Sequence, residues 1–362
     1  MGNLMHCQRI IGPEGLEALW PGNDPYTATD HEPVIPDWIS YGLEMGKKVP
    51  GAYGSSQDFR NTILVNRDRH YRDPGQSIDL LKEKCRGKRF LIVCPGPSCS
   101  DVLGSCDLPD DVVVLAINKA ISFIRLDHPN RYGLIMERNA KESWLRNSRD
   151  DMLVPWVPDC KLITIPESSA WLADMWPLEN RYYCETPWYN VPEDSRAHFP
   201  RLMNWYITPS LALDMARYLG ASKIIMVGCD LSFTMGGMYY HDTPCDQHPN
   251  YAEHSAQFHA LGFNGELCMS SSTFTFHRNG LEAIIYWIER TARIPVLNAT
   301  GAGILDWRPT LLEEAIYGDH EPIVDYFTGE IEGPGSRSEF NAPQDVQREV
   351  ARPVLQGAVA CG

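Results

Sequence analysis

The chain has little positive charge for its length, no long apolar run and no standard glycine-rich phosphate motif. Its 362 residues carry 32 Lys and Arg against 47 Asp and Glu, for a formal net charge of −15. This balance argues against a general binder of nucleic acid, because such proteins present a basic face to the phosphates. No stretch approaches the roughly 18 apolar residues of a membrane-spanning helix. The N-terminus also has no signal-peptide pattern, so we expect neither a membrane span nor secretion.

Two common nucleotide-binding signatures are absent as well. A Gly-x-x-x-x-Gly-Lys-Ser/Thr loop does not occur, which excludes a P-loop kinase at the level of motifs. Gly-x-Gly-x-x-Gly does not follow the first strong strand, which argues against a dinucleotide oxidoreductase. The 11 cysteines would suit a disulfide scaffold only in a much shorter secreted chain, and Cys94 and Cys229 fall within apolar runs. The sequence therefore predicts a reduced, cytoplasmic protein.

The clearest unit in the chain is the run from Arg89 to Ser98, Arg-Phe-Leu-Ile-Val-Cys-Pro-Gly-Pro-Ser. A short apolar run closed by Gly and Pro is typical of a buried strand that ends in a forced turn. In open α/β sheets, ligands bind at the carboxyl ends of the strands, so a phosphate can approach such a turn. A plain strand-to-helix connection is the competing interpretation of this loop.

Further strand and helix patterns follow with helix-length spacers between the strands. This alternation predicts an α/β, Rossmann-like fold, with a mostly parallel open sheet flanked by helices. The expected strands are Phe90–Val93, Val112–Asn118, Arg131–Met136, Cys160–Pro166, Lys223–Asp230 and Ile294–Asn298, and the expected helices are Ser77–Lys84 with Ser77 as N-cap, Ser210–Leu219 and Asn279–Arg290.

Composition suggests three parts. Residues 1–85 form an irregular N-terminal extension packed on the core, 86–310 the α/β domain, and 311–362 a C-terminal extension that we expect to be a mobile tail. Within the domain, about 168–206 is rich in aromatic residues and Pro, and we expect an insertion beside the sheet. Its aromatic side chains could contact a sugar acceptor, although ordinary packing of a surface subdomain explains them equally simply.

Three segments, in order, resemble one superfamily. Ile-Val-Cys-Pro-Gly-Pro-Ser, ending at Ser98, is similar to the Gly-Pro-Ser nucleotide loop of family 42 sialyltransferases and of the related MptE-like proteins. The latter include the flagellin motility accessory factors and the archaeal 6-hydroxymethylpterin diphosphokinases. Tyr218 to Phe233 resembles the helix-to-strand unit that ends in Gly-x-Asp-Leu, and Leu297 to Ile304 resembles the closing strand and glycine loop. The similarity covers residues 86–306, about 60% of the chain.

The resemblance implies a nucleotide-donor site and a transferase activity. The implied donor-binding residues are Pro95, Gly96, Pro97, Ser98, Asn118, Asn139, Thr208, Ser210, Gly228 and Asp230. His277 occupies a position comparable to that of the sialyltransferase base, shortly before the last expected helix, and an imidazole titrates near neutral pH. Tyr239 and Tyr240 can donate hydrogen bonds to a departing phosphate. Ordinary capping or loop packing competes with each of these roles.

Two departures from the sialyltransferase pattern concern the donor itself. Pro95 stands where those enzymes commonly have Asn, and Ser232 stands near the position of a tyrosine that serves the leaving phosphate. The sequence therefore indicates a transferase, most simply a glycosyltransferase, that uses a nucleotide-activated donor such as a CMP-sugar and a sugar or other hydroxyl acceptor. No tightly bound cofactor is expected. A homo-oligomer is compatible with the sequence, which does not define the oligomeric state.

Two alternatives to this function stay open. A pyrophosphokinase of the pterin type would need Mg²⁺, for which Glu137, Asp230 and Asp242 offer carboxylates. A non-catalytic nucleotide-binding protein of the same fold is the second alternative, since the changes at Pro95 and Ser232 are compatible with loss of activity.

A metal site in the polar loop is a separate and less favoured hypothesis. Cys245, His248, His254, His259 and Cys268 fall within it, but no second closely spaced ligand pair accompanies the first, as structural zinc sites usually require.

Overall fold

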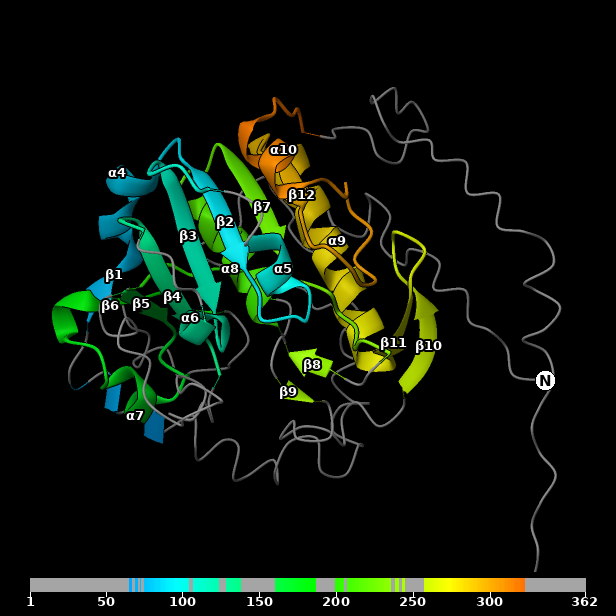
Figure 1. Ribbon diagram of the computed structural model, residues 1–362. Coiled ribbons are helices and arrows are strands. Elements are labelled where there is room, and N and C mark those ends of the chain that lie inside the picture. Colours follow the sequence, from blue (N-terminus) through cyan, green and yellow to red (C-terminus); the bar gives the residue numbers. More distant parts are fainter. Residues whose placement is uncertain are drawn as a thin grey trace, which may run out of the picture.

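The computed structural model describes residues 65–66, 69–70, 72, 75–103, 107–123, 128–137, 160–186, 199–204, 207–235, 238–240, 243–244 and 257–322. Its centre is an eight-stranded sheet in the order β1-β6-β5-β4-β3-β2-β7-β12, and every neighbouring pair in it is parallel. The fold is therefore the predicted α/β, Rossmann-like arrangement (Figure 1).

All six predicted strands are present in this sheet. They are β2 (Arg89–Val93), β3 (Val112–Ile117), β4 (Arg131–Ile135), β5 (Lys161–Thr164), β7 (Lys223–Val227) and β12 (Val296–Asn298). Every residue of β3 and β7 is buried, as expected for strands covered by helices on both faces.

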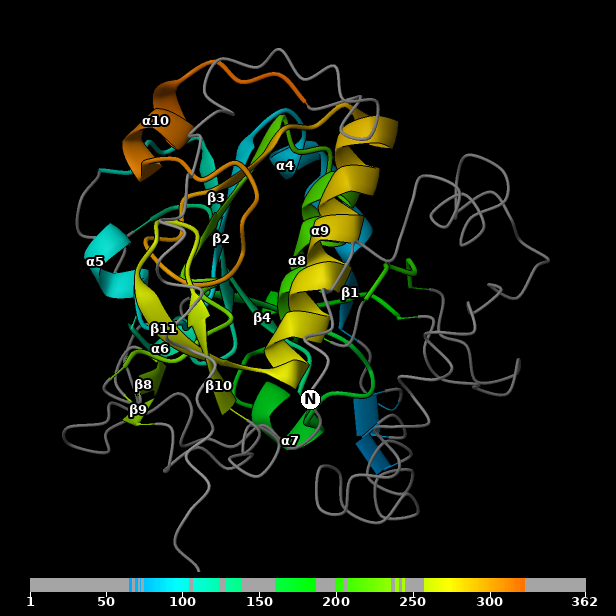
Figure 2. The same cartoon turned by 90° about the vertical axis from the view of Figure 1, so that its right-hand side faces the viewer.

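Successive side chains of each strand enter two separate cores. Phe90 and Ile92 of β2 pack on one face of the sheet, and Leu91 and Val93 on the other. The first face is covered by α4 (Lys82–Cys85), α8 (Thr208–Tyr218) and α9 (Ser272–Ala292), and the second by α5 (Cys99–Leu103), α6 (Ala120–Phe123), α7 (Ala170–Ala173) and α10 (Leu312–Tyr317). Figure 2 shows the sheet between α8 and α9 on one side and α5 and α10 on the other.

The aromatic-rich stretch at 168–206 is not an insertion beside the sheet where the structure describes it, and that prediction is wrong. Within it, β6 (Arg181–Tyr183) is a strand of the main sheet and pairs with β5 on one side and β1 (Gln76–Ser77) on the other. Trp176 is buried, and its Nε1 donates to the carbonyl of Cys160 at 3.0 Å. Tyr182 and Tyr183 of β6 are buried as well, so these three aromatic side chains belong to the core at this end of the sheet, whereas Trp171 is exposed. Trp188, Tyr189 and Trp205 lie outside the described residues.

The segment before β2 begins as predicted. Ser77 is an N-cap whose hydroxyl accepts from the Asp79 N–H, and it precedes the 3₁₀ helix η1 (Ile78–Leu81) and then α4. A second 3₁₀ helix, η3 (Leu178–Asn180), leads into β6. Residues 311–322 include α10, whose Leu312, Ala315 and Ile316 belong to the core on its side of the sheet. Residues 323–362 lie outside the description.

Two small antiparallel pairs follow β7. One joins β8 (Met238–Tyr240) to β9 (Thr243–Pro244), and the other is the hairpin β10 (Gln257–Leu261) and β11 (Leu267–Ser271).

The helix α9 begins at Ser272, seven residues before the predicted start at Asn279. The Ser271 hydroxyl accepts from the Phe274 N–H and starts the helix there, and Phe274 then packs against Phe233. Among the described residues, none of the helices combines the length and apolarity that crossing a membrane requires.

Candidate functional site at the carboxyl ends of β2 and β7

The strand order reverses at β2, and this places two predicted loops side by side. After β2 the chain continues to β3 on one side, whereas β7, which comes much later, pairs with β2 on the other side. Such a topological switch point leaves a crevice at the carboxyl ends of the two strands, where open α/β sheets bind their ligands. Here the switch point lies between β2 and β7, and we call residues 94–98 after β2 and residues 228–230 after β7 the switch-point loops.

The two loops are in direct backbone contact. The Cys94 N–H donates to the Val227 carbonyl at 2.9 Å, and the Gly96 N–H donates to the Gly228 carbonyl at 2.9 Å. A Cβ at Gly96 would collide with this carbonyl and with the carboxylate of Asp230. Gly228 has a φ of +64°, in the left-handed region that favours glycine. The glycines of both motifs are therefore required by the contact between the loops.

Asp230 holds the Gly-Pro-Ser turn. Its Oδ1 accepts from the Ser98 N–H at 3.2 Å, and its Oδ2 accepts from the Ser98 hydroxyl at 3.1 Å. Burial raises the pKa of Asp230 to about 7, and the two hydrogen bonds from Ser98 oppose that rise. Both oxygens of the Asp230 side chain are thus used to fix the neighbouring loop.

A second carboxylate, which no sequence pattern predicts, lies near Asp230. Glu266, between β10 and β11, accepts from the Gly303 N–H through Oε1 at 2.7 Å, and its charge contributes to the raised pKa of Asp230. Its Oε2 is buried and has no hydrogen-bond partner in the described structure. The Ile304 N–H donates to the Asp230 carbonyl at 2.9 Å, which joins the third motif to the second. No sequence pattern signals Glu266, because it approaches only through the hairpin.

Asn118 and Thr208 meet beside the switch-point loops. Asn118 ends β3 with a φ of +49°, and its Nδ2 donates to the Thr208 hydroxyl at 3.1 Å. The Asn118 Oδ1 is buried without a hydrogen-bond partner in the described part of the chain. Thr208 is the first residue of α8, so its position is fixed by the start of that helix. The side-chain amide of Asn118 thus carries an unused acceptor at the strand end.

The other predicted donor-binding residues differ in accessibility. Pro95, Gly96, Pro97 and Ser98 are half-buried at the edge of the sheet. Ser210 is fully buried, and its hydroxyl donates to the Ile207 carbonyl at 2.6 Å and the Asn204 Oδ1 at 3.2 Å. These contacts give Ser210 a role in the first turn of α8. Asn139 lies outside the described residues.

The predicted catalytic residues are described only in part. His277 lies inside α9, because the helix begins earlier than expected, and its ring centroid is 5.9 Å from that of Phe276. The expectation that His277 precedes the last helix is therefore wrong. Tyr239 and Tyr240 belong to β8, and only their backbone is described.

The hypotheses about metals concern residues that are partly outside the description. Cys245, His248, His254 and Asp242 are among the undescribed residues, whereas His259 and Cys268 lie on β10 and β11. Within the described residues, no group of three or more Asp, Glu, His or Cys side chains is arranged to hold a metal ion. The carbonyl of Glu137 accepts from the Ser169 N–H at 3.0 Å.

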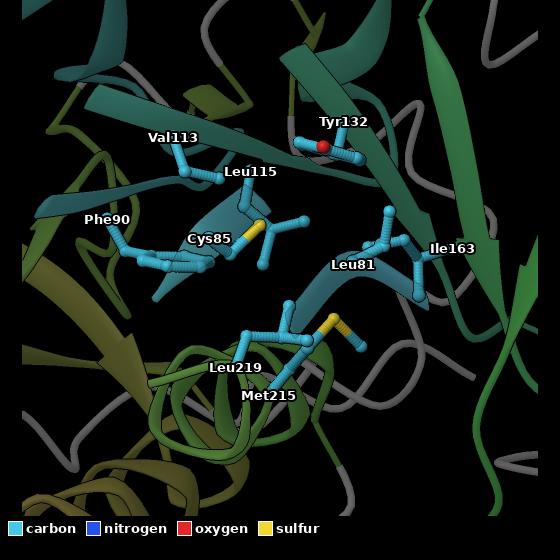
Figure 3. Close-up of a pocket in the computed structure, with 9 residues that line it drawn as sticks. All are labelled: Leu81, Cys85, Phe90, Val113, Leu115, Tyr132, Ile163, Met215 and Leu219. Atoms are coloured by element: carbon cyan, nitrogen blue, oxygen red, sulfur yellow. The ribbon is translucent and has the colours of Figure 1, made fainter. Parts of the chain in front are cut away.

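An internal gap in the core is not a ligand site. Figure 3 shows it between the sheet and α8, lined by apolar residues such as Phe90, Leu115 and Met215, and it has no room for a water molecule.

Comparisons with known proteins add one distant match. No family model and no curated protein matches the chain. One solved structure that is similar is the MAf glycosyltransferase from Magnetospirillum magneticum AMB-1, at 17% identity and a TM-score of 0.48. The match covers 69% of this chain and 37% of the other, so the chain spans little more than a third of that enzyme. A similarity of this degree does not assign a function.

Proposed function

We propose that the protein is a transferase that binds a nucleotide-activated donor at the switch-point loops, most simply a glycosyltransferase of the sialyltransferase-like type. The observation that carries this proposal is the Ser98–Asp230 connection, at 3.2 Å and 3.1 Å, across the carboxyl ends of β2 and β7. It fixes a half-buried turn at the crevice where α/β sheets bind ligands.

The polar groups near this crevice suit a donor with a base, a ribose and a phosphate. The unpaired Oδ1 of Asn118 can accept a hydrogen bond from an exocyclic amine or a hydroxyl of the ligand. The accessible edge of the Gly96–Ser98 turn suits the close approach of a phosphate or ribose. Asp230 acts as a positioning residue in this proposal, since its oxygens already accept from Ser98.

His277 and the two tyrosines of β8 complete the proposal for catalysis. His277 would remove the proton of the acceptor hydroxyl, and Tyr239 or Tyr240 would donate to the phosphate that leaves with the nucleotide. The proton then passes from the acceptor to the imidazole, and the new glycosidic bond forms as the bond between sugar and phosphate breaks.

The first experiment is a thermal-shift panel with CMP, CDP, UDP, GDP and ATP, each with and without Mg²⁺. A ligand that binds only the folded protein raises the unfolding midpoint according to its concentration and affinity. A selective rise with CMP that needs no metal supports the sialyltransferase-like proposal. A rise only with ATP and Mg²⁺ contradicts it in favour of a pyrophosphokinase, and no rise with any ligand removes the nucleotide site.

The second experiment separates catalysis from binding. His277→Ala should abolish transfer to an acceptor while leaving the nucleotide-dependent thermal shift unchanged. His259→Ala is a matched control, because His259 is an exposed histidine on β10. Wild-type transfer by the His277 variant would remove that residue from the mechanism.

A further inference from the structure

The amino-terminal ends of the same strands border an open cavity of about 390 Å³. Arg89 and Lys223 begin β2 and β7, and Pro295 directly precedes β12. The remaining lining comes from Ser222, from Arg293 at the end of α9, and from residues 316–322, which include the end of α10 and the chain after it. This cavity lies at the edge of the sheet opposite to the switch-point loops, as the strand directions in Figure 1 show.

Lys223 brings a buried positive charge to this cavity. Lys223 is only 9% exposed, and its Nζ donates to the Ala315 carbonyl at 3.0 Å and the Gly318 carbonyl at 2.5 Å. No carboxylate lies within ion-pair distance of this Nζ in the described part of the chain. Burial lowers the pKa of Lys223, with a further contribution from the positive charge of Arg89. The ammonium has three protons and uses two of them on carbonyls, which leaves one donor available.

Two guanidinium groups stand beside it. Arg89 is engaged, since it donates to the Ile316 carbonyl at 2.9 Å and to Asp111 at 2.6 Å. Arg293 is exposed at the left-handed end of α9, with a φ of +56°, and makes no hydrogen bond or ion pair within the described structure. Its five donors are therefore available to a ligand in the cavity.

The donors that Lys223 and Arg293 leave unused suit an anion. Neither side chain has a carboxylate within ion-pair distance among the described residues, whereas the charge of Arg89 is balanced by Asp111. Asp319 and Glu321 bring two negative charges to the same lining, so the preference for an anion rests on the unused donors and not on a net charge. A desolvated ammonium without a carboxylate partner is costly, and an anion that accepts from it would lower that cost.

We propose that this cavity binds a small phosphate group, either as inorganic phosphate or as a phosphomonoester, through Lys223, Arg293 and the hydroxyl of Ser222. Lys223 and Arg89 hold the end of α10 through its carbonyls, and the bound anion would occupy the donors that α10 does not use. The site is independent of the nucleotide site, because it lies at the other edge of the sheet.

The test is calorimetric titration of the full chain with inorganic phosphate and, separately, with glycerol 3-phosphate, at constant ionic strength set by NaCl. Saturable binding of either ligand is the expected result. Arg293→Gln should weaken binding about tenfold, the effect of losing one hydrogen bond to a charged group. Arg290→Gln is the matched control, since Arg290 is exposed on the last turn of α9 and does not line the cavity. Its affinity should stay within about twofold of wild type.

Several outcomes would overturn the proposal. Absence of saturable binding for both ligands would do so, as would equal losses in the Arg290 and Arg293 variants, which indicate diffuse charge effects. Binding of the ester alone supports a phosphomonoester as the ligand, and binding of both supports the phosphate group itself. Lys223→Met is a second variant that should also weaken phosphate binding, and circular dichroism checks that this variant is folded. The nucleotide-dependent thermal shift should be unchanged in Arg293→Gln, so failure of either site is recognised separately.

Discussion

Ser98 and Asp230 lie 132 residues apart, and both oxygens of the Asp230 carboxylate accept hydrogen bonds from Ser98, at 3.2 Å from its N–H and 3.1 Å from its hydroxyl. This pair joins the loop after β2 to the loop after β7. The aspartate that the sequence offers as a ligand for ribose or metal therefore serves the neighbouring loop. Both of its oxygens are used to fix the Gly-Pro-Ser turn.

Removing either half of this pair should loosen the Gly-Pro-Ser turn. Ser98→Ala should cost about 1 kcal/mol of unfolding free energy, since the hydroxyl bond is lost and the backbone bond stays. Asp230→Ala should cost about 2–3 kcal/mol, because it leaves the half-buried Ser98 N–H without its acceptor and also removes the bond to the Ser98 hydroxyl. Urea unfolding measures both variants. If the double variant costs as much as the two single changes added together, the two residues are not coupled and the pair does not hold the turn.

The raised pKa of Asp230 predicts a dependence of stability on pH. A carboxyl whose pKa rises from 3.8 to about 7 on folding favours the folded state below about pH 4, and this contribution is lost as the pH rises through 7. The shift corresponds to an upper limit of about 4 kcal/mol. Asp230→Asn should flatten this part of the stability profile between pH 4 and 8.

The matched control for this profile is Asp101→Asn, which changes an exposed carboxylate on α5. Its profile should follow that of the wild type. A slope between pH 4 and 8 that survives in Asp230→Asn would assign the titration to another group.

The lowered pKa of His70 predicts the opposite dependence of stability on pH. Its Nε2 lies 3.2 Å from the Ser168 carbonyl, which can only accept, so the proton of the neutral ring sits on Nε2 and Nδ1 accepts from the Tyr183 hydroxyl at 2.8 Å. Burial lowers the pKa of His70 from 6.5 to about 4. The contribution to stability is therefore present above pH 6.5 and lost as the pH falls through 4.

His70→Gln should remove this acid-sensitive part of the unfolding free energy, about 2–3 kcal/mol at most. Chemical unfolding at pH 4.5 and pH 7.5 compares the variant with the wild type. His259→Gln, at an exposed position on β10, controls for the loss of a histidine. An unchanged difference between the two pH values in His70→Gln would contradict the assignment.

Two tryptophans, one in α7 and one just after it, differ in burial and should therefore differ in their contribution to stability. Trp176 is 1% exposed and donates to the Cys160 carbonyl, whereas Trp171 is 54% exposed. Trp176→Phe should cost about 1–3 kcal/mol, because it removes the hydrogen bond from Trp176 to the Cys160 carbonyl and opens space in the core. Trp171→Phe should change stability by less than about 0.5 kcal/mol. Equal effects on the thermal midpoint would contradict the different burial of the two rings.

Much of the central sheet follows from the sequence. Phe90–Val93, Val112–Ile117 and Lys223–Val227 are apolar runs that only burial on both faces accommodates, and the spacers between them require crossover connections. The glycines at 96 and 228 also mark the two loops correctly, since turn chemistry is local. The sequence did not predict the shortest strands. The two-residue strand β1 pairs with β6 from the aromatic stretch, and neither has a period that distinguishes it from a loop.

The start of α9 is a second feature that the sequence did not predict correctly. Residues 272–278 contain β-branched and aromatic side chains that weaken a helical prediction, yet the Ser271 cap and the burial of Phe274 begin the helix there. Tertiary packing thus overrode local propensity and moved His277 into the helix.

The sequence by itself determined the strands, the two strand-end loops and the residue types available for chemistry there, because apolar runs and turns are encoded within a few neighbouring residues. Only the tertiary structure decided which side chains meet. The pairing of Ser98 with Asp230, the approach of Glu266 through the hairpin, and the grouping of Lys223 with Arg293 at the opposite edge all depend on the order of the strands. Parallel strands are joined through distant crossovers, so no local signal fixes their neighbours, and burial of the whole sheet selects the order.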